Sequence, residues 1–409
     1  MKKIRLYGGK PLCGEINISG SKNAALPIIF ACILTKGVSV IRNLPHIGDT
    51  LVALDLLRSF GADVWEDDGA TYIDTRRLSY ISPDRELVSK IRASTYLIGS
   101  CLSRFGRSPL LAFGGCNFAK RPIDMHIDAC LALGGQLSDK EIIAGRLVGG
   151  KITFDKKSVG ATVNAILLAS AAEGKTIIRG GASEPHIDSL IDFLISCGSE
   201  ICRVKDELHI VGRELHGGEI TIIGDMIEAG SYIVAGLITS GDVRLKNCPV
   251  GDMQAIFDSL KSLGAEIEIN QNYVTASLRE KSREISISAD PYPGFPTDLQ
   301  PLFAPLLAAF SGGEITDNVW QTRFGYLDEL SRVGVKYKLN GNSAKIYPSK
   351  IVNSVATAPD LRGGMACLLA ALRAEGKSEI YSAETILRGY ENLEKKLYAL
   401  GADIKIENT

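Results

Sequence analysis

The strongest constraint on the fold of this chain is a unit of sequence that recurs six times. Each copy closes with an amphipathic segment and a glycine ahead of a short β-rich stretch; the six glycines are Gly61, Gly134, Gly198, Gly264, Gly334 and Gly401. They are separated by 73, 64, 66, 70 and 67 residues. Because a nearly fixed period indicates one supersecondary module used repeatedly, we expect six similar structural units, which fit two domains of three units each.

Within a copy, a short strand leads to a polar cluster, an apolar helix, a second strand and an amphipathic helix. The first copy begins with Glu15–Ser19, and the third to sixth begin at Lys151, Glu219, Glu284 and Ser354. The second copy, which runs through residues 92–134, is the most altered. A generic α/β fold with coincidental spacing is the alternative.

The first helix of most copies is apolar nearly all round, whereas later helices such as Leu393–Leu400 have one polar face. Helices that are apolar on every side are buried, so we expect inner helices wrapped by sheet in each domain. These predicted inner helices span residues 24–35, 161–173, 229–239, 302–310 and 365–375.

Composition excludes several classes of function. A net charge of −1 gives no general attraction to nucleic acid or to an anionic membrane. The N-terminal residues lack the apolar core of a signal peptide, so we expect a cytoplasmic protein that does not span a membrane. The nine cysteines include no CxxC pair and indicate neither a disulfide framework nor a zinc site. The sequence contains no Walker motif and no GxGxxG motif after a strand, so it does not indicate NTP hydrolysis or a dinucleotide cofactor.

A loop at residues 113–126 concentrates reactive groups. Cys116 follows Gly114 and Gly115, and Lys120 and Arg121 come shortly after it. Neighbouring cations lower the pKa of a thiol and raise its thiolate fraction, which favours a chemical role on a mobile loop. The alternative is that Cys116 resembles the other cysteines, which lie mostly in apolar segments, and that the glycines only turn the chain.

Polar residues also collect at the starts of the apolar helices. Helix N-termini attract phosphates and carboxylates, so the pattern predicts a small polyanionic ligand such as a nucleotide or a phosphorylated acid. Single arginines near turns, Arg92, Arg323 and Arg388, need a carboxylate or an anionic ligand if they approach the core. The helix-start residues are Lys22, Asn23, Lys156, Ser158, Asp225, Glu228, Thr297, Asp298, Asp360 and Arg362.

Seven motifs in this order resemble those of the enolpyruvyl transferases: Ser19–Pro27, Gly114–Cys116, Arg121–His126, Ser158–Thr162, Phe295–Gln300, Asp360–Arg362 and Arg388–Glu391. The resemblance covers nearly the whole chain. It implies a two-domain inside-out α/β barrel of six βαβαββ-type repeats, three per domain, with the active site between the domains. One domain would be residues 22–224 with a catalytic lid loop at about 112–122, and the other residues 1–21 and 225–409.

The resemblance also implies a reaction. The enolpyruvyl group of phosphoenolpyruvate would move to the 3-hydroxyl of UDP-N-acetylglucosamine with release of phosphate, without metal or cofactor, as the first committed step of peptidoglycan synthesis. Cys116 matches the lid thiol that protonates the methylene carbon and that fosfomycin alkylates, and Asp298 matches the acceptor of the hydroxyl proton. Lys22, Arg121 and Arg388 match the residues that hold phosphoenolpyruvate.

The remaining matches concern substrate binding. Arg323 and Arg362 support the anion-binding residues, and Asp360 and His126 fall within the matching motifs. The positions that match contacts to the UDP-sugar are Asn23, Arg92, Arg121, Pro122, Ile123, Asp124, Met125, Lys156, Lys157, Ser158, Val159, Asp298 and Val319.

Five residues depart from the family pattern: Lys157, Met226, Gln321, Thr322 and Leu387. They leave the acceptor open. One alternative is a related enolpyruvyl transferase that uses another nucleotide, such as UMP in nucleoside antibiotic assembly. The other is a catalytically silent relative that binds a nucleotide sugar. The sequence does not determine the oligomeric state.

Overall fold

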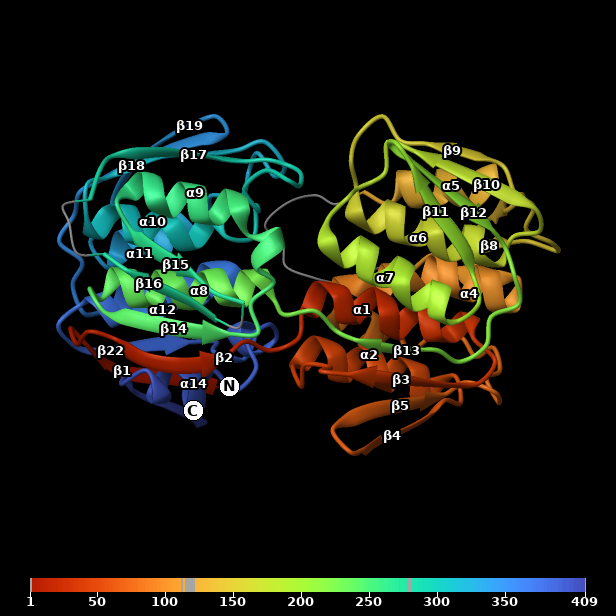
Figure 1. The fold of residues 1–409 in the computed structure, drawn as a ribbon, viewed down its shortest axis with the longest axis horizontal. Coiled ribbons are helices and arrows are strands. Elements are labelled where there is room, and N and C mark those ends of the chain that lie inside the picture. The colour runs from red at the N-terminus through yellow and green to blue at the C-terminus, as the bar shows by residue number, and fades with distance from the viewer. Residues whose placement is uncertain (1, 112, 115–121, 272, 279–281, 409) are drawn as a thin grey trace. The chain divides into compact units, whose positions relative to one another are not determined.

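The computed structural model describes residues 2–111, 113–114, 122–271, 273–278 and 282–408. The chain divides into two compact units (Figure 1). The first unit consists of residues 20–223 without the loop 115–121, and the second of residues 2–19 and 224–408. No described helix combines the length and apolar character that a bilayer crossing requires.

The third and fifth copies show the complete repeat of strand, helix, strand, helix and two strands. The third contains β9 (Lys151–Thr153), α6 (Val159–Ala171), β10 (Lys175–Arg179), α7 (Pro185–Ser196), β11 (Glu200–Val204) and β12 (Glu207–Val211). The fifth contains β17 (Ile285–Ala289), α10 (Gln300–Ala309), β18 (Gly313–Asp317), α11 (Tyr326–Arg332), β19 (Lys336–Asn340) and β20 (Ser343–Tyr347).

The first, fourth and sixth copies take one strand each from a distant part of the chain. The first contains α1 (Lys22–Ala31), β3 (Val38–Arg42), α2 (Gly48–Ser59), β4 (Asp63–Asp67) and β5 (Ala70–Asp74). The fourth contains α8 (Met226–Ile238), β14 (Asp242–Lys246), α9 (Gln254–Leu263), β15 (Glu266–Ile269) and β16 (Tyr273–Ser277). The sixth contains β21 (Val355–Thr357), α12 (Leu361–Arg373), β22 (Gly376–Tyr381), α13 (Glu384–Leu387), α14 (Leu393–Ala399) and β23 (Asp403–Asn408).

In the part of the chain that the structure describes, five four-stranded sheets share one pairing pattern, in which a parallel pair is extended by two antiparallel strands. The second copy contains α3 (Arg85–Lys90), α4 (Leu97–Phe105), β6 (Arg107–Pro109), α5 (Asp124–Ala132), β7 (Gln136–Ser138) and β8 (Glu141–Ile143). Its strands form a three-stranded sheet in the order β6-β8-β7, so the prediction that this copy is the most altered is confirmed.

The six closing glycines play one conformational role. All have φ between 94° and 108°, and each lies just after the last helix of its copy. This left-handed backbone region is open to glycine at little cost and is the usual way to end a helix. The spacing in the sequence therefore reports a real structural period.

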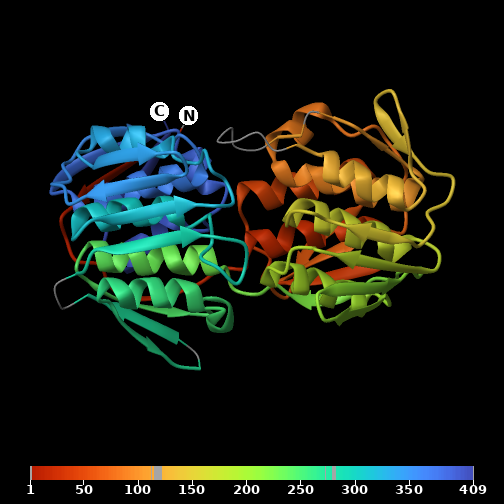
Figure 2. The same ribbon diagram turned by 90° about the horizontal axis from the view of Figure 1, so that it is seen from above.

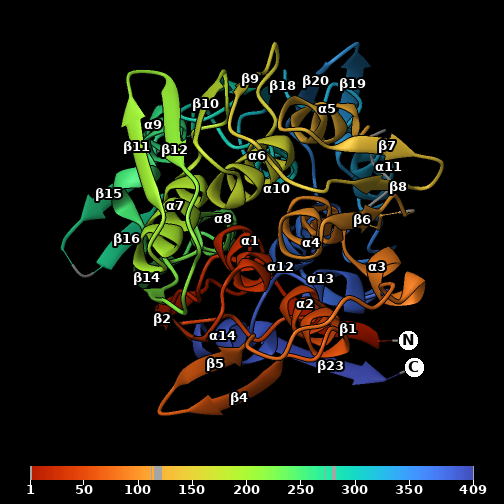
Figure 3. The same cartoon turned by 90° about the vertical axis from the view of Figure 1, so that its right-hand side faces the viewer.

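The predicted inner helices are confirmed. In the second unit α8, α10 and α12 pack against one another, and nearly all of their residues are buried. In the first unit α4 packs against α1 and α6. Figure 3 shows the sheets containing β3, β12 and β8 around these helices of the first unit. Helices inside and sheets outside agree with the predicted inside-out arrangement.

The prediction that Glu15–Ser19 opens the first copy and that Glu219 opens the fourth is wrong. The first of these strands, β2 (Cys13–Asn17), pairs in parallel with β14 of the fourth copy, and β13 (Glu219–Thr221) pairs with β3 of the first. Both segments read Glu-Ile-polar-Ile, so local sequence does not distinguish their partners. The N-terminal strand β1 (Lys2–Gly8) completes the sixth sheet between β22 and β23, and Figures 1 and 2 show the two chain ends side by side.

The chain passes between the units at residues 19–20 and 223–224. Within each unit, an asparagine side chain makes the same kind of contact beside one of these connections. Asn43 Nδ2 donates to the Ile222 carbonyl at 2.8 Å in the first unit, and Asn247 Nδ2 donates to the Ile18 carbonyl at 2.8 Å in the second. Both asparagines have positive φ, at 55° and 59°. The exchange of β2 and β13 is therefore fixed by the same side-chain contact on both sides.

Candidate active site

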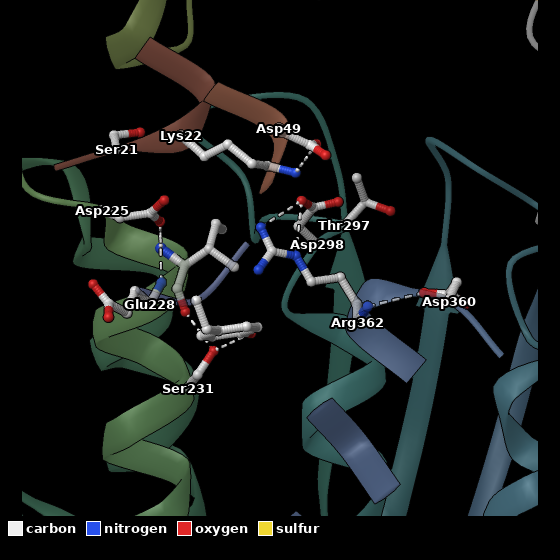
Figure 4. Close-up of polar contacts among 12 residues, drawn as sticks. Ser21, Lys22, Asp49, Asp225, Glu228, Ser231, Thr297, Asp298, Asp360 and Arg362 are labelled. Carbon is white, nitrogen blue, oxygen red and sulfur yellow. Dashed lines mark hydrogen bonds and ion pairs between the residues drawn. The ribbon is translucent and has the colours of Figure 1, made fainter. Parts of the chain in front are cut away.

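Asp298 lies between two buried arginines in the second unit. It lies in the segment between β17 and α10, and its Oδ1 accepts a hydrogen bond from Arg323 Nη1 at 2.8 Å. Its Oδ2 accepts one from Arg362 Nε at 3.1 Å (Figure 4). The side chains of Arg323 and Arg362 are 4% and 3% exposed, whereas that of Asp298 is 29% exposed. Two cations thus hold an ionised carboxylate that one side leaves open to a ligand.

Arg362 comes from the first turn of α12, whose inner position explains its burial. Burial by itself lowers the pKa of Arg362, but Tyr390, Asp298 and Asp225 outweigh it and hold the pKa above its ordinary value. The guanidinium also lies over the Tyr390 ring, 5.4 Å from the centroid, and the Tyr390 hydroxyl is 2.8 Å from Ser231 Oγ. Arg362 is therefore a fixed, permanently charged partner of Asp298.

The helix starts of the second unit converge around this pair. Asp360 caps α12 by accepting from the Arg362 and Gly363 N–H groups, and Asp225 caps α8 by accepting from Ile227 and Glu228. Both aspartates therefore satisfy their own helices, which explains the acidic residues at positions where the sequence suggested anion binding. Arg362, at the start of α12, thus has charged partners in the segment before α10 and at the start of α8.

A fully buried aspartate, Asp317, lies at the end of β18, and the sequence analysis did not single it out. Its Oδ1 accepts from the Val319 and Trp320 N–H groups at 2.9 and 2.7 Å, and its Oδ2 accepts from Thr297 Oγ1 at 2.6 Å. Burial raises the pKa of Asp317, and these donors partly oppose the shift. The only signal in the sequence was an acidic residue closing a predicted strand ahead of Arg323.

The other predicted residues of the second unit lie in loops and at helix ends. Val319 and Arg388 are half-buried, and Arg388 directly follows α13. Gln321 and Thr322, which depart from the family pattern, are exposed ahead of the buried Arg323. Met226 begins α8, and Leu387 ends α13. These departures thus lie at loop and helix ends, outside the Asp298 contacts.

Lys22 is the predicted anion ligand of the first unit. It opens α1 behind the N-cap Ser21, and its Nζ lies 3.4 Å from Asp49 Oδ2 of α2. The side chains of Lys22 and Asp49 are 14% and 7% exposed, so the ammonium is partly withdrawn from water. Asn23 follows on the same turn and is half-buried. The charge of Lys22 and the free N–H groups of the helix N-terminus both favour binding of an anionic group.

His126 is held in one tautomer by Asn164 of α6. The Gly99 N–H donates to Asn164 Oδ1 at 2.6 Å, so Asn164 Nδ2 is left to donate to His126 Nδ1 at 2.7 Å and to the Thr95 carbonyl at 3.1 Å. His126 Nδ1 must then be the acceptor, which leaves the proton on Nε2. Burial, with Arg92 adding to it, lowers the pKa of His126 to about 4. The imidazole is therefore a neutral hydrogen-bond donor near neutral pH.

Most of the residues matched to nucleotide binding lie in the first unit at the starts of α5 and α6. Met125 and Lys156 line a pocket of about 410 Å³ together with Asp128, Lys151 and Thr153. Ser158 caps α6, and its Oγ accepts from the Ala161 N–H at 3.3 Å. Arg92 and Val159 of the same set are half-buried, and Pro122, Ile123, Asp124 and Lys157 lie at or just before the starts of α5 and α6.

Cys116, Lys120 and Arg121 lie outside the described residues, so the loop chemistry stays a prediction from sequence. Among the residues that the structure describes, no group of three or more His, Cys, Asp and Glu side chains is arranged to hold a metal ion.

Comparison with known proteins agrees with the fold. A family profile described as EPSP synthase (3-phosphoshikimate 1-carboxyvinyltransferase) matches residues 6–397. A Halothermothrix orenii protein named UDP-N-acetylglucosamine 1-carboxyvinyltransferase is 39% identical over 412 residues, which cover 99% of both chains. A Caldanaerobacter subterraneus subsp. tengcongensis protein named UDP-N-acetylglucosamine 1-carboxyvinyltransferase 3 is 41% identical, again over 99% of both.

Solved structures give the same fold over the full length. The enolpyruvyl transferase NikO from Streptomyces tendae has a TM-score of 0.91 at 25% identity and covers 100% of this chain and 99% of its own. EPSP synthase from Acinetobacter baumannii, at 17% identity, has a TM-score of 0.77 and covers 100% of both chains, which shows the fold alone. By its family profile and its full-length relatives, this chain belongs to the EPSP synthase family of enolpyruvyl transferases.

Proposed function

We propose that this chain transfers the enolpyruvyl group of phosphoenolpyruvate to the 3-hydroxyl of UDP-N-acetylglucosamine and releases phosphate, as the first committed step of peptidoglycan synthesis. The observation that carries the proposal is the carboxylate of Asp298 held by Arg323 and Arg362. Full-length relatives named for this activity, at 39% and 41% identity, support the acceptor. Both substrates are cytoplasmic metabolites, which favours a cytoplasmic enzyme, and the two compact units would be its two domains.

Asp298 is the proposed general base. An ionised carboxylate can take the proton of the 3-hydroxyl while the oxygen bonds to C2 of phosphoenolpyruvate, and Cys116 gives a proton to C3. Loss of phosphate and of one proton from C3 then restores the double bond in the product. Because both arginines keep Asp298 ionised, the base is ready at neutral pH before the acceptor arrives.

The proposed cations provide for the small substrate. Lys22, Arg121 and Arg388 would hold the phosphate and carboxylate of phosphoenolpyruvate, and each charge-assisted hydrogen bond contributes roughly 1.5–3 kcal/mol. The fixed neutral Nε2–H of His126, beside Asn164 and the start of α6, suits a polar group of the nucleotide sugar without adding charge. The pocket lined by Met125 and Lys156 would take part of the same ligand.

The acceptor is tested by comparing phosphate release from phosphoenolpyruvate with UDP-N-acetylglucosamine, UMP and shikimate 3-phosphate. We expect turnover with the nucleotide sugar and at most background release with the other two. Turnover with UMP alone would identify a nucleoside-specific relative instead, and tight binding of UDP-N-acetylglucosamine without phosphate release would identify a silent binding protein. Fosfomycin inactivation that is lost on replacing Cys116 would place the thiol at the reacting centre.

A further inference from the structure

Asp317 connects two segments that both reach the proposed base. The first is the turn just after β18, whose Val319 and Trp320 N–H groups donate to Asp317 Oδ1. The second is the segment before α10, from which Thr297 Oγ1 donates to Asp317 Oδ2 at 2.6 Å. Thr297 directly precedes Asp298 in the chain. One fully buried carboxylate therefore sets the spacing between the base and the loop that carries Arg323.

The same two segments are joined a second time through Arg323 and Gln300. Arg323 Nη1 donates to the Thr297 carbonyl at 3.2 Å as well as to Asp298. Tyr326 donates its hydroxyl hydrogen to Gln300 Oε1 at 2.7 Å, which leaves Gln300 Nε2 to donate to the Arg323 carbonyl at 2.8 Å. The contacts form a closed network around Asp317, with Asp298 on its exposed side.

We propose that Asp317 is a positioning residue for the enolpyruvyl transfer, which fixes the orientation of Asp298 through Thr297 and that of Arg323 through the turn after β18. The inference rests on the proposed function, because it assigns Asp298 the role of base. Asp317 itself is fully buried and does not reach a ligand. Its effect on the reaction passes through the two residues that it holds.

A purely structural cap explains only part of this geometry. Capping the turn needs the two N–H contacts of Oδ1, which span two and three residues. The Thr297 contact spans 20 residues and comes from the segment that carries the base. If the carboxylate served stability alone, the loss of the threonine hydroxyl would lower the melting temperature and leave the rate of chemistry unchanged.

Thr297→Val removes the hydroxyl, which donates to Asp317 and also accepts from Arg323 Nη1 at 3.4 Å, and keeps the side-chain volume. Thr297→Ser is the matched control because it restores the hydroxyl. For Thr297→Val we expect kcat to fall by about tenfold or more, equivalent to about 1.4 kcal/mol, with the KM for phosphoenolpyruvate changed by less than about twofold. Thr297→Ser should recover most of the loss. Both variants should unfold at similar temperatures, so stability does not explain the difference.

Asp317→Asn gives an independent test through the other partner. Its amide oxygen still accepts from Val319 and Trp320, but its amide nitrogen faces Thr297 Oγ1 and cannot accept the hydroxyl hydrogen. If Asp317 acts through Thr297, the double variant Asp317→Asn/Thr297→Val loses little more kcat than the worse single variant.

Three outcomes overturn the positioning role: equal kcat for Thr297→Val and wild type, equal losses for the valine and serine variants, or additive losses in the double variant. Failure of the proposed function looks different, because the wild-type protein itself then releases no phosphate with UDP-N-acetylglucosamine.

Discussion

The ammonium of Lys396 lies 2.6 Å from Glu228 Oε1, and the two side chains are only 12% and 3% exposed. Lys396 also donates to Ser19 Oγ at 2.5 Å, and the Ser19 N–H donates to Glu228 Oε2 at 2.7 Å. One buried ion pair thus ties α14 and α8 to the last residue of the second unit before a connection to the first. Although Glu228 lies at a helix start, both of its carboxylate oxygens are engaged by Ser19 and Lys396 and are not directed to a ligand.

This network predicts a pH dependence of stability. Burial raises the pKa of Glu228 to about 7 from 4.5, with Lys396 opposing the shift. Between these pH values the folded state binds more protons than the unfolded state, so the contribution of Glu228 is complete below about pH 4.5 and is lost as pH rises through about 7. In urea unfolding from about pH 5 to 8, the free energy of unfolding of wild type relative to Glu228→Gln should fall by on the order of 2–3 kcal/mol.

The control should be flat in this range. Lys36 lowers the pKa of the exposed Glu214 from its ordinary value of 4.5, so any contribution of Glu214 changes only at more acidic pH and Glu214→Gln should show little change between about pH 5 and 8. Parallel unfolding curves for wild type and Glu228→Gln across this range would refute the role assigned to burial of Glu228.

The glycines at the two connections predict a matched pair of stability losses. A Cβ on Gly20 would lie 1.9 Å from the Asn43 carbonyl oxygen, and one on Gly224 would lie 2.0 Å from that of Asn247. Backbone oxygens in strand ends cannot move away cheaply, so Gly20→Ala and Gly224→Ala should each lower the free energy of unfolding by roughly 1–3 kcal/mol. Gly145→Ala, where the Cβ meets nothing within 4 Å, should be neutral in the same urea titration. Neutral Gly20→Ala would contradict the close approach.

The repeat could be read from the sequence because it depends on local rules. A glycine after the last helix of a copy is favoured because φ there is near 100°, and an inner helix must be apolar on every side. Which strand joins which sheet depends on distant contacts. β2 and β13 share the same alternating pattern, so only the structure shows their exchange, with Asn43 and Asn247 fixing it.

The candidate site divides in the same way. Asp298 and Arg362 could be named because they belong to short motifs, and Arg323 because it is a single arginine near a turn. The structure brings the three together. Asp317 and Asn164 could not, because an acid after a strand or an amide inside an apolar helix has many ordinary uses. Their roles depend on which partner lies across the fold, 20 residues away for Asp317 and 38 for Asn164.

Substitutions of Cys116, the proposed lid thiol, should separate catalysis from inhibition by fosfomycin. Cys116→Ser should bind both substrates but release phosphate far more slowly, by roughly 10²–10⁴-fold, because a hydroxyl is a poor proton donor near neutral pH. Cys116→Asp should keep activity and resist fosfomycin, since a carboxyl transfers a proton but opens the epoxide poorly. The measurement is phosphate release before and after incubation with fosfomycin. Equal sensitivity of Cys116→Asp and wild type would show that another residue is alkylated.

The contacts of Asp298 predict that its effect on stability, through charge balance, can be separated from its effect on catalysis. Asp298→Asn removes the proposed base, so we expect kcat to fall by roughly 10²–10⁴-fold. It also removes one counter-charge from each of the two buried guanidinium groups. Because the Asp298 carboxylate is partly exposed, we expect this substitution to lower the free energy of unfolding by about 2–4 kcal/mol.

Adding Arg323→Gln to Asp298→Asn removes one of the unbalanced charges. Part of the lost stability should return, because a neutral amide is far cheaper to bury than an unpaired guanidinium. Activity should not return, because no base has been restored. Urea unfolding and phosphate release measured on the same samples test both statements. If the double variant regained turnover, Asp298 would be serving only to neutralise Arg323, and the base would have to be sought elsewhere in the site.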